Sequence, residues 1–216
     1  MRQPADSVQI SLFMKGPAPL TWVFAGDSIT QGVKHTHGRR SFVELCAEYI
    51  RWEKGRRMDM VINSGVDGST TTEMLANFSW LIGRFDPHIV LLMMGTNDCN
   101  GGRVPLGQFE EHLRTFLNRV RAGKGIPVLQ TPSYIMVNEA GSGTSGSRES
   151  IGQYAMAIRL VAEETGTILV DHWKHWEQAA VTDPGMLQSA WLDDPIHPGP
   201  KGHVEIAGLI VKQLRL

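Results

Sequence analysis

The stretch Thr21-Trp22-Val23-Phe24-Ala25-Gly26 is a short, almost wholly apolar run that ends at a glycine. Four further runs share this character and comprise residues 60–62, 89–94, 128–131 and 168–170. Continuous apolar runs, as opposed to alternating ones, are typical of strands in a parallel sheet whose two faces are both covered. The runs therefore predict a mainly parallel central sheet of about five strands.

Helical patterns separate these runs. One apolar stripe follows the spacing i, i+4, i+7, i+8 and i+11, and it comprises Phe109, Leu113, Phe116, Leu117 and Val120. Residues 206–214 repeat the pattern, and residues 42–52 and 150–164 indicate two more helices. The alternation predicts an α/β fold of the flavodoxin-like, three-layer α/β/α kind, with right-handed crossovers. Ligand sites in such folds lie beyond the carboxyl ends of the strands.

Composition limits the classes of function. The 216 residues suit one domain spanning residues 1–216. The chain has 21 Lys and Arg against 22 Asp and Glu, a net charge of −1, which argues against a nucleic-acid partner. Its two cysteines, Cys46 and Cys99, are too few for a disulfide framework and lack the spacing of a metal or redox pair.

The first twenty residues contain no sustained apolar run, because Asp6, Gln9 and Lys15 interrupt it. We therefore expect neither a signal peptide nor a membrane span, and a cytoplasmic location. A chain from which a leader had been removed would look the same.

A glycine-rich stretch spans residues 141–147 and matches the pattern G-x-G-x-x-G. A dinucleotide-binding turn would directly follow a strand in the first βα unit. This stretch comes late and follows no strand, so we interpret it as a mobile loop.

Polar residues follow the predicted strands and form four blocks. They are Gly26-Asp27-Ser28-Ile29-Thr30, the segment from Asn63 to Thr70, Gly95-Thr96-Asn97-Asp98, and Asp193-Asp194-Pro195-Ile196-His197-Pro198. Ser28 is a candidate nucleophile, His197 a general base, and Asp194 a group that orients the imidazole. Gly68 and Asn97 are candidate donors to an oxyanion.

Each block alone also has a structural explanation. Ser28 could be the N-cap of a helix, and Gly68 could simply supply a positive φ. Asn97 could form a turn with Asp98, and His197 could be merely exposed. The four blocks together, each after a strand or in a loop at the same predicted edge, favour the catalytic interpretation.

The four blocks resemble those of the GDSL, or SGNH, hydrolase family of serine esterases and lipases. They span Gly26 to Pro198, which is most of the chain. The resemblance implies that Ser28, Asp194 and His197 form a catalytic triad. It also implies that the Ser28 amide, Gly68 and Asn97 form the oxyanion hole. Pro195 stands where the family often has glycine, but the D-x-x-H spacing is intact.

The resemblance requires no metal or cofactor. His35-Thr36-His37 could supply two metal ligands, but no third ligand can be placed, so a polar loop over the site is favoured. That loop, residues 33–40, and the loop of residues 133–147 should border the cleft. The tryptophans near the last block could stack on a sugar or line an acyl pocket, although packing is the favoured interpretation. They are Trp173, Trp176 and Trp191.

The resemblance implies a serine esterase for short acyl groups, such as O-acetyl groups on carbohydrates or small molecules. The alternatives are a lysophospholipase or thioesterase for longer chains, and a catalytically silent binding module. A nucleotide binder is disfavoured because Asp27 would repel phosphate at the first turn. The sequence assigns no substrate-binding residues and no oligomeric state.

Overall fold

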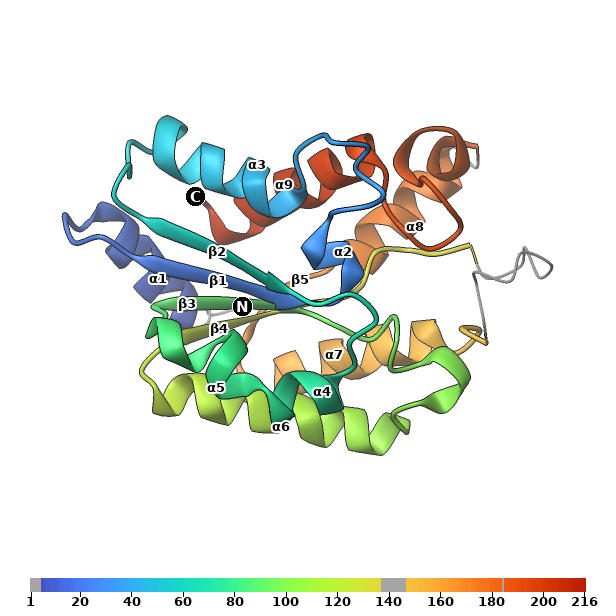
Figure 1. Cartoon of the computed structure of the whole chain (residues 1–216), viewed down its shortest axis with the longest axis horizontal. Coiled ribbons are helices and arrows are strands. Elements are labelled where there is room, and N and C mark those ends of the chain that lie inside the picture. The colour runs from blue at the N-terminus through green and yellow to red at the C-terminus, as the bar shows by residue number, and fades with distance from the viewer. Residues whose placement is uncertain (1–4, 137–146, 184) are drawn as a thin grey trace.

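The computed structural model describes residues 5–136, 147–183 and 185–216. Its centre is a sheet of five parallel strands in the order β2-β1-β3-β4-β5 (Figure 1). The strands are β1 (Thr21–Gly26), β2 (Met60–Gly65), β3 (Ile89–Met93), β4 (Ile126–Gln130) and β5 (Ile168–Val170). The predicted five-stranded α/β fold is confirmed. The strand order reverses between β1 and β3, where folds of this class place their ligand sites.

Nine α-helices occur in the described ranges. They are α1 (Ala5–Lys15), α2 (Ser28–Gln31), α3 (Phe42–Glu48), α4 (Thr71–Ala76), α5 (Phe78–Leu81), α6 (Leu106–Ala122), α7 (Ile151–Thr165), α8 (His172–Thr182) and α9 (Pro200–Leu214). Figure 1 shows α3 and α9 on one side of the sheet and α4 to α7 on the other. The helix predicted over 42–52 continues past α3 as a π-helical turn, Tyr49–Glu53.

The side chains of β1 alternate between two apolar cores. Trp22 and Phe24 pack into the core beneath α3 and α9, and Val23 and Ala25 pack into the core beneath α6 and α7. All four side chains are essentially inaccessible to solvent. Because both faces of β1 are covered, the strand has no polar face, which explains the continuous apolar run in the sequence.

An ion pair between Arg56 and Asp59 fastens α1 to the sheet. The Asp59 carboxylate accepts hydrogen bonds from the Trp22 indole at 3.0 Å and from the amide of Leu20 at 3.0 Å. The Arg56 guanidinium bonds Asp59 at 2.8 Å and donates to the Gly16 carbonyl at 2.8 Å. Each buried charge is therefore satisfied by several partners. The helices predicted from the sequence do not include α1.

The tryptophans of the C-terminal region are packing residues in this structure. Trp176 is fully buried and meets Trp191 edge to face, with ring centroids 5.0 Å apart. Trp173 is also buried and contacts Tyr134. Among the helices of the described ranges, none has the length and apolar character needed to cross a bilayer. Residues 141–146 of the glycine-rich stretch lie outside the described residues.

Candidate active site

Ser28 is the first residue of α2, immediately after β1. Asp27 occupies the N-cap position, where its Oδ1 accepts the Ile29 amide hydrogen at 3.0 Å. The alternative that Ser28 is itself the N-cap is therefore wrong. Gly32 ends the helix after one turn by donating its N–H to the Ser28 carbonyl at 2.9 Å. This leaves the Ser28 hydroxyl free to contact other side chains.

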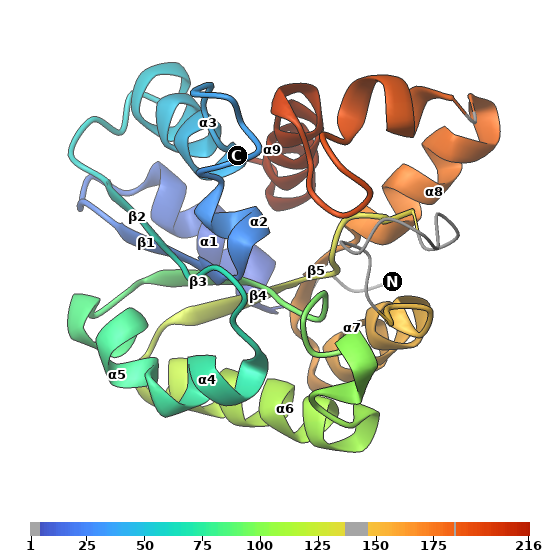
Figure 2. The same cartoon turned by 45° about the vertical axis from the view of Figure 1, so that its right-hand side comes forward.

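A chain of hydrogen bonds joins Ser28, His197 and Asp194. The Ser28 Oγ lies 3.1 Å from His197 Nε2. On the other side of the ring, His197 Nδ1 lies 2.9 Å from Asp194 Oδ2 and 3.1 Å from Oδ1. Figure 2 shows α2 and the loop that precedes α9 at the same end of the sheet. The structure thus brings together all three side chains that the sequence named as a triad.

The protonation states of these groups follow from their partners. Burial would raise the pKa of Asp194, but hydrogen bonds from the backbone of His197 and Ile196, at 2.7 and 2.8 Å, outweigh it and lower that pKa. An ionised carboxylate only accepts hydrogen bonds, so His197 Nδ1 carries the hydrogen and Nε2 presents its lone pair to Ser28. Burial also lowers the pKa of His197, against the opposing effect of Asp194. The ring is therefore poised as a neutral base.

The loop that carries Asp194 and His197 accommodates Pro195 without losing these contacts. The Pro195 carbonyl accepts the Met136 amide hydrogen at 2.8 Å. Within the loop, Asp193 donates its N–H to the His197 carbonyl at 2.9 Å. Proline has no N–H to donate, but its carbonyl still takes part in a hydrogen bond. The departure from the family pattern therefore leaves the geometry of Asp194 and His197 intact.

Gly68 and Asn97 lie on loops that are tied to Ser28's strand and to each other. The loop after β2 is held to β1 by a hydrogen bond from the Val66 amide to the Gly26 carbonyl, at 2.9 Å. The Asn97 amide, Nδ2, donates to the Ser69 carbonyl at 3.1 Å, which leaves its second hydrogen available. Within the described residues, no acceptor faces the backbone N–H of Ser28 or of Gly68. Three donors are thus uncommitted at this edge of the sheet.

Asp98 joins the Asn97 block to the start of α4. Its Oδ1 accepts the N–H of Thr71 at 2.8 Å and the Thr71 hydroxyl at 2.6 Å, and its Oδ2 accepts the Gly95 amide at 3.1 Å. Burial nevertheless raises the pKa of Asp98. From the sequence, the only role indicated for Asp98 is a turn with Asn97.

Two arginines outside the four sequence blocks hold the candidate oxyanion residues. Arg148 is buried, and it donates from Nε to the Thr96 carbonyl at 2.8 Å and from Nη2 to Asn97 Oδ1 at 3.3 Å. Arg103 donates to the Gly68 carbonyl at 3.1 Å. Arg148 lies 51 positions from Asn97, and Arg103 lies 35 positions from Gly68. No spacing in the sequence indicates either contact.

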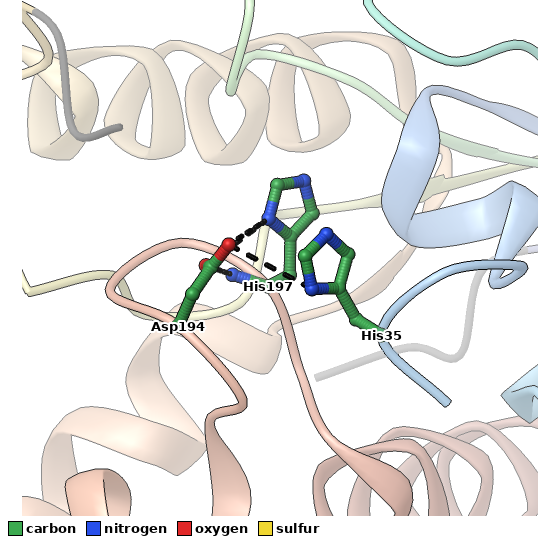
Figure 3. A group of neighbouring side chains, drawn as sticks. All are labelled: His35, Asp194 and His197. Atoms are coloured by element: carbon green, nitrogen blue, oxygen red, sulfur yellow. Dashed lines mark hydrogen bonds and ion pairs between the residues drawn. The ribbon is translucent and has the colours of Figure 1, made fainter. Parts of the chain in front are cut away.

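His35 lies flat against the ring of His197. The ring centroids are 3.8 Å apart and the planes differ by 3° (Figure 3). His35 Nδ1 lies 2.8 Å from Asp193 Oδ2, and His37 Nε2 bonds the other oxygen of Asp193. Burial would raise the pKa of Asp193, but hydrogen bonds from His37 and His35 outweigh it and lower the pKa. The loop of residues 33–40 therefore borders the site, as predicted.

The same side chains can be tested as a metal site. Candidate ligand atoms of His35, Asp194 and His197 lie within 4.8 Å of one another. An imidazole nitrogen binds a metal along its lone pair, in the plane of the ring, and structural zinc sites are tetrahedral. Two rings stacked in parallel direct these lone pairs side by side, so they do not converge on one ion. The arrangement fits a hydrogen-bonded stack and does not fit a metal.

Asp27 differs from the sequence-based expectation that it would repel a phosphate. Its side chain is buried, and desolvation raises its pKa to about 7, with a further contribution from Asp98. The carboxyl group therefore faces the protein interior and is only partly charged at neutral pH. Its structural role is to cap α2.

The comparisons with known proteins identify the family of the chain. The sequence pattern of the GDSL-like lipase/acylhydrolase family matches residues 24–204. An acetylxylan esterase of Geobacillus stearothermophilus is 28% identical over 89% of this chain and 92% of its own length. An uncharacterized lipoprotein of Bacillus subtilis is 26% identical over 82% of each chain.

Solved structures show the same fold. A catalytic mutant of an acetylxylan esterase from Geobacillus stearothermophilus superposes with a TM-score of 0.76 at 24% identity, covering 94% of this chain and 97% of that one. An alpha/beta hydrolase from the metagenome of Lake Arreo in Spain gives 0.74 at 25% identity, covering 94% and 98%. With its family pattern matched over most of its length, the chain belongs to the GDSL-like lipase/acylhydrolase family.

Proposed function

We propose that this protein is a serine esterase that removes short acyl groups, above all O-acetyl groups of carbohydrates or small molecules, through an acyl-Ser28 intermediate. The observation that supports this most directly is the unbroken chain of hydrogen bonds from Ser28 through His197 to Asp194. A serine hydroxyl is a weak nucleophile, and a neutral imidazole within hydrogen-bond distance is what it needs to react.

In the first half of the reaction, Ser28 Oγ attacks the ester carbonyl while its proton passes to His197 Nε2. Asp194 remains ionised and stabilises the imidazolium that forms. His197 then gives the proton to the oxygen of the leaving alcohol. The products of this half are the free alcohol and an acyl group on Ser28.

In the second half, water attacks the acyl group while His197 accepts a proton from it, and Ser28 leaves with that proton. Both halves pass through a tetrahedral oxyanion. The N–H groups of Ser28 and Gly68 and the amide of Asn97 donate to that oxygen. Removal of one such donor typically costs about 2.7–4 kcal/mol of transition-state stabilisation. The chain itself supplies every group that these steps use.

One observation supports a short acyl group on a polar alcohol. The relative that matches 89% of this chain is an acetylxylan esterase. The pocket of about 380 Å³ beside Gly68 is lined by Asp67, Glu73 and Asn77 and also by the apolar Val66, Trp80 and Leu81, so its walls do not by themselves favour a short over a long acyl chain.

The test is hydrolysis of p-nitrophenyl esters of increasing acyl length, with Ser28→Ala measured beside the wild type. We expect acetate to be cleaved fastest and the variant to be inactive. Fastest cleavage of long-chain esters, with an inactive variant, would favour a lysophospholipase or thioesterase instead. A wild type as inert as the variant on every ester, and on acetylated xylo-oligosaccharides, would favour a silent binding module.

A further inference from the structure

His35 and Asp193 form a second imidazole–carboxylate pair alongside His197 and Asp194. The aspartates are adjacent in the sequence, and the two histidine rings are parallel with centroids 3.8 Å apart. Each ring turns its Nδ1 toward a carboxylate, at 2.8 Å for His35 and 2.9 Å for His197. In Figure 3, both Nε2 atoms point away from Asp194, to the same side. The two rings therefore present two nitrogens side by side.

The two Nε2 atoms differ in their hydrogen-bond partners. His197 Nε2 bonds the Ser28 hydroxyl, whereas His35 Nε2 has no hydrogen-bond partner within the described residues. The His35 side chain is mostly buried, with 15% of its surface exposed. Because Asp193 and the stacked His197 ring hold the His35 ring in place, this open nitrogen is fixed beside the reacting groups, where a bound molecule can contact it.

The position of that contact follows from the reaction. During acylation the oxygen of the leaving alcohol must lie within hydrogen-bond distance of His197 Nε2, because it takes its proton from there. The neighbouring ring is only 3.8 Å away, between centroids. In the leaving alcohol, one carbon bears the ester oxygen. A hydroxyl gauche to it on the neighbouring carbon lies about one hydrogen-bond length, roughly 2.8 Å, from that oxygen. Such a hydroxyl would meet His35 Nε2.

We propose that His35 binds the free hydroxyl adjacent to the ester in the leaving alcohol, so that the enzyme selects monoesters of vicinal diols. Partly acylated sugar rings belong to this class. The inference rests on the proposed esterase function and adds a recognition residue to it. A hydroxyl suits this position in either protonation state of the ring, because it can donate to a neutral Nε2 and accept from a protonated one.

Asp193 fixes the orientation that this recognition requires. Its two oxygens bond His35 and His37, and its own amide is bonded to the His197 carbonyl. His37 is 64% exposed and does not stack on His197. His37 bonds the same carboxylate, Asp193, as His35, but it does not lie beside His197. It is therefore a suitable control.

The experiment compares two acetates that differ at one group, 2-hydroxyethyl acetate and 2-methoxyethyl acetate. The methyl ether keeps the electron-withdrawing oxygen but has no hydrogen to donate. The measured quantity is the ratio of kcat/KM for the two esters, because kcat/KM reports acylation, when the alcohol is still bound. The variants are His35→Phe, which keeps a flat ring for stacking, and His37→Phe.

We expect the wild type to prefer the hydroxy ester, and His35→Phe to reduce that preference roughly 2- to 10-fold, the range of one neutral hydrogen bond. His37→Phe should leave the preference unchanged. An unchanged ratio in His35→Phe would overturn the inference. If the unchanged ratio came with an equal loss on both esters, His35 would only support the His197 ring. Failure of the wild type on both esters would instead refute the proposed function.

Discussion

Replacement of Asn97 by alanine tests the oxyanion hole most directly. The Asn97 side chain is almost fully buried, with 7% of the residue exposed. Its Nδ2 donates one hydrogen to the Ser69 carbonyl at 3.1 Å, and its Oδ1 accepts from Arg148 at 3.3 Å. These two contacts fix the plane of the amide, so its second N–H points in one direction. The donor is therefore oriented before substrate arrives, which gives such groups their large effect.

We expect Asn97→Ala to lower both kcat and the free energy of unfolding. Loss of one preorganised donor should lower kcat about 10²- to 10³-fold, which corresponds to about 2.7–4 kcal/mol. KM should change little, because the donor acts mainly on the charge that develops in the transition state. The substitution also removes the partner of the Ser69 carbonyl. The free energy of unfolding should consequently fall by about 1–3 kcal/mol.

The assay is steady-state hydrolysis of p-nitrophenyl acetate, at a temperature where thermal unfolding shows the variant to be folded. Asn100→Ala is the matched control, because Asn100 lies close by in the chain and its Oδ1 accepts only the Ser147 amide in the described residues. It should keep nearly the wild-type kcat. If Asn97→Ala is folded and its kcat lies within threefold of the wild type, on the order of 0.6 kcal/mol, then Asn97 is not an oxyanion donor.

Four further outcomes follow from the structure. Ser28→Ala should retain only background hydrolysis, and a burst of p-nitrophenol from this variant would contradict the acyl-serine route. Because burial lowers the pKa of His197, kcat/KM should stay high below the ordinary value of 6.5 and fall only at lower pH, as the base becomes protonated; a midpoint above 6.5 would contradict this. Gly65→Ala should lower the free energy of unfolding by about 1–3 kcal/mol in urea titrations, because its Cβ would lie 2.4 Å from Gln31 N. Gly68→Ala has open space but a φ of +70° and should cost roughly 1–2 kcal/mol, so an unchanged urea midpoint in either variant would refute its steric argument.

The sheet and the four polar blocks could be predicted because their signals are local. Each strand contains a short apolar run. The first block begins at the last residue of β1, the second begins within β2 at Asn63, and the third begins just after β3. Parallel strands bring their carboxyl ends to one edge, so residues as distant as Ser28 and Asn97 could be placed together without knowledge of any contact. The D-x-x-H spacing likewise linked Asp194 to His197 within one short segment.

The supporting residues could not be predicted, because they act through distant contacts. Arg148 reaches Asn97 across 51 positions, and His35 reaches Asp193 across 158. Spacing alone favoured Asp194 over Asp193, and only the folded chain shows that Asp193 also holds a histidine. The helix α4 is a different case. Thr70 and Glu73 form a capping box that is visible in the sequence, but the run of Gly, Ser and Thr before it looks like a turn.

The hydrogen bond between Ser28 and His197 closes a loop of 169 positions. Bringing together the ends of such a loop costs roughly 4–5 kcal/mol of chain entropy, which local contacts cannot offset early in folding. In the proposed mechanism, the nucleophile Ser28 emerges from the ribosome long before the base His197. Ester cleavage by this mechanism can begin only when the segment around His197 docks against α2. Catalytic activity in this protein thus reports complete folding, and a partly folded chain should show none.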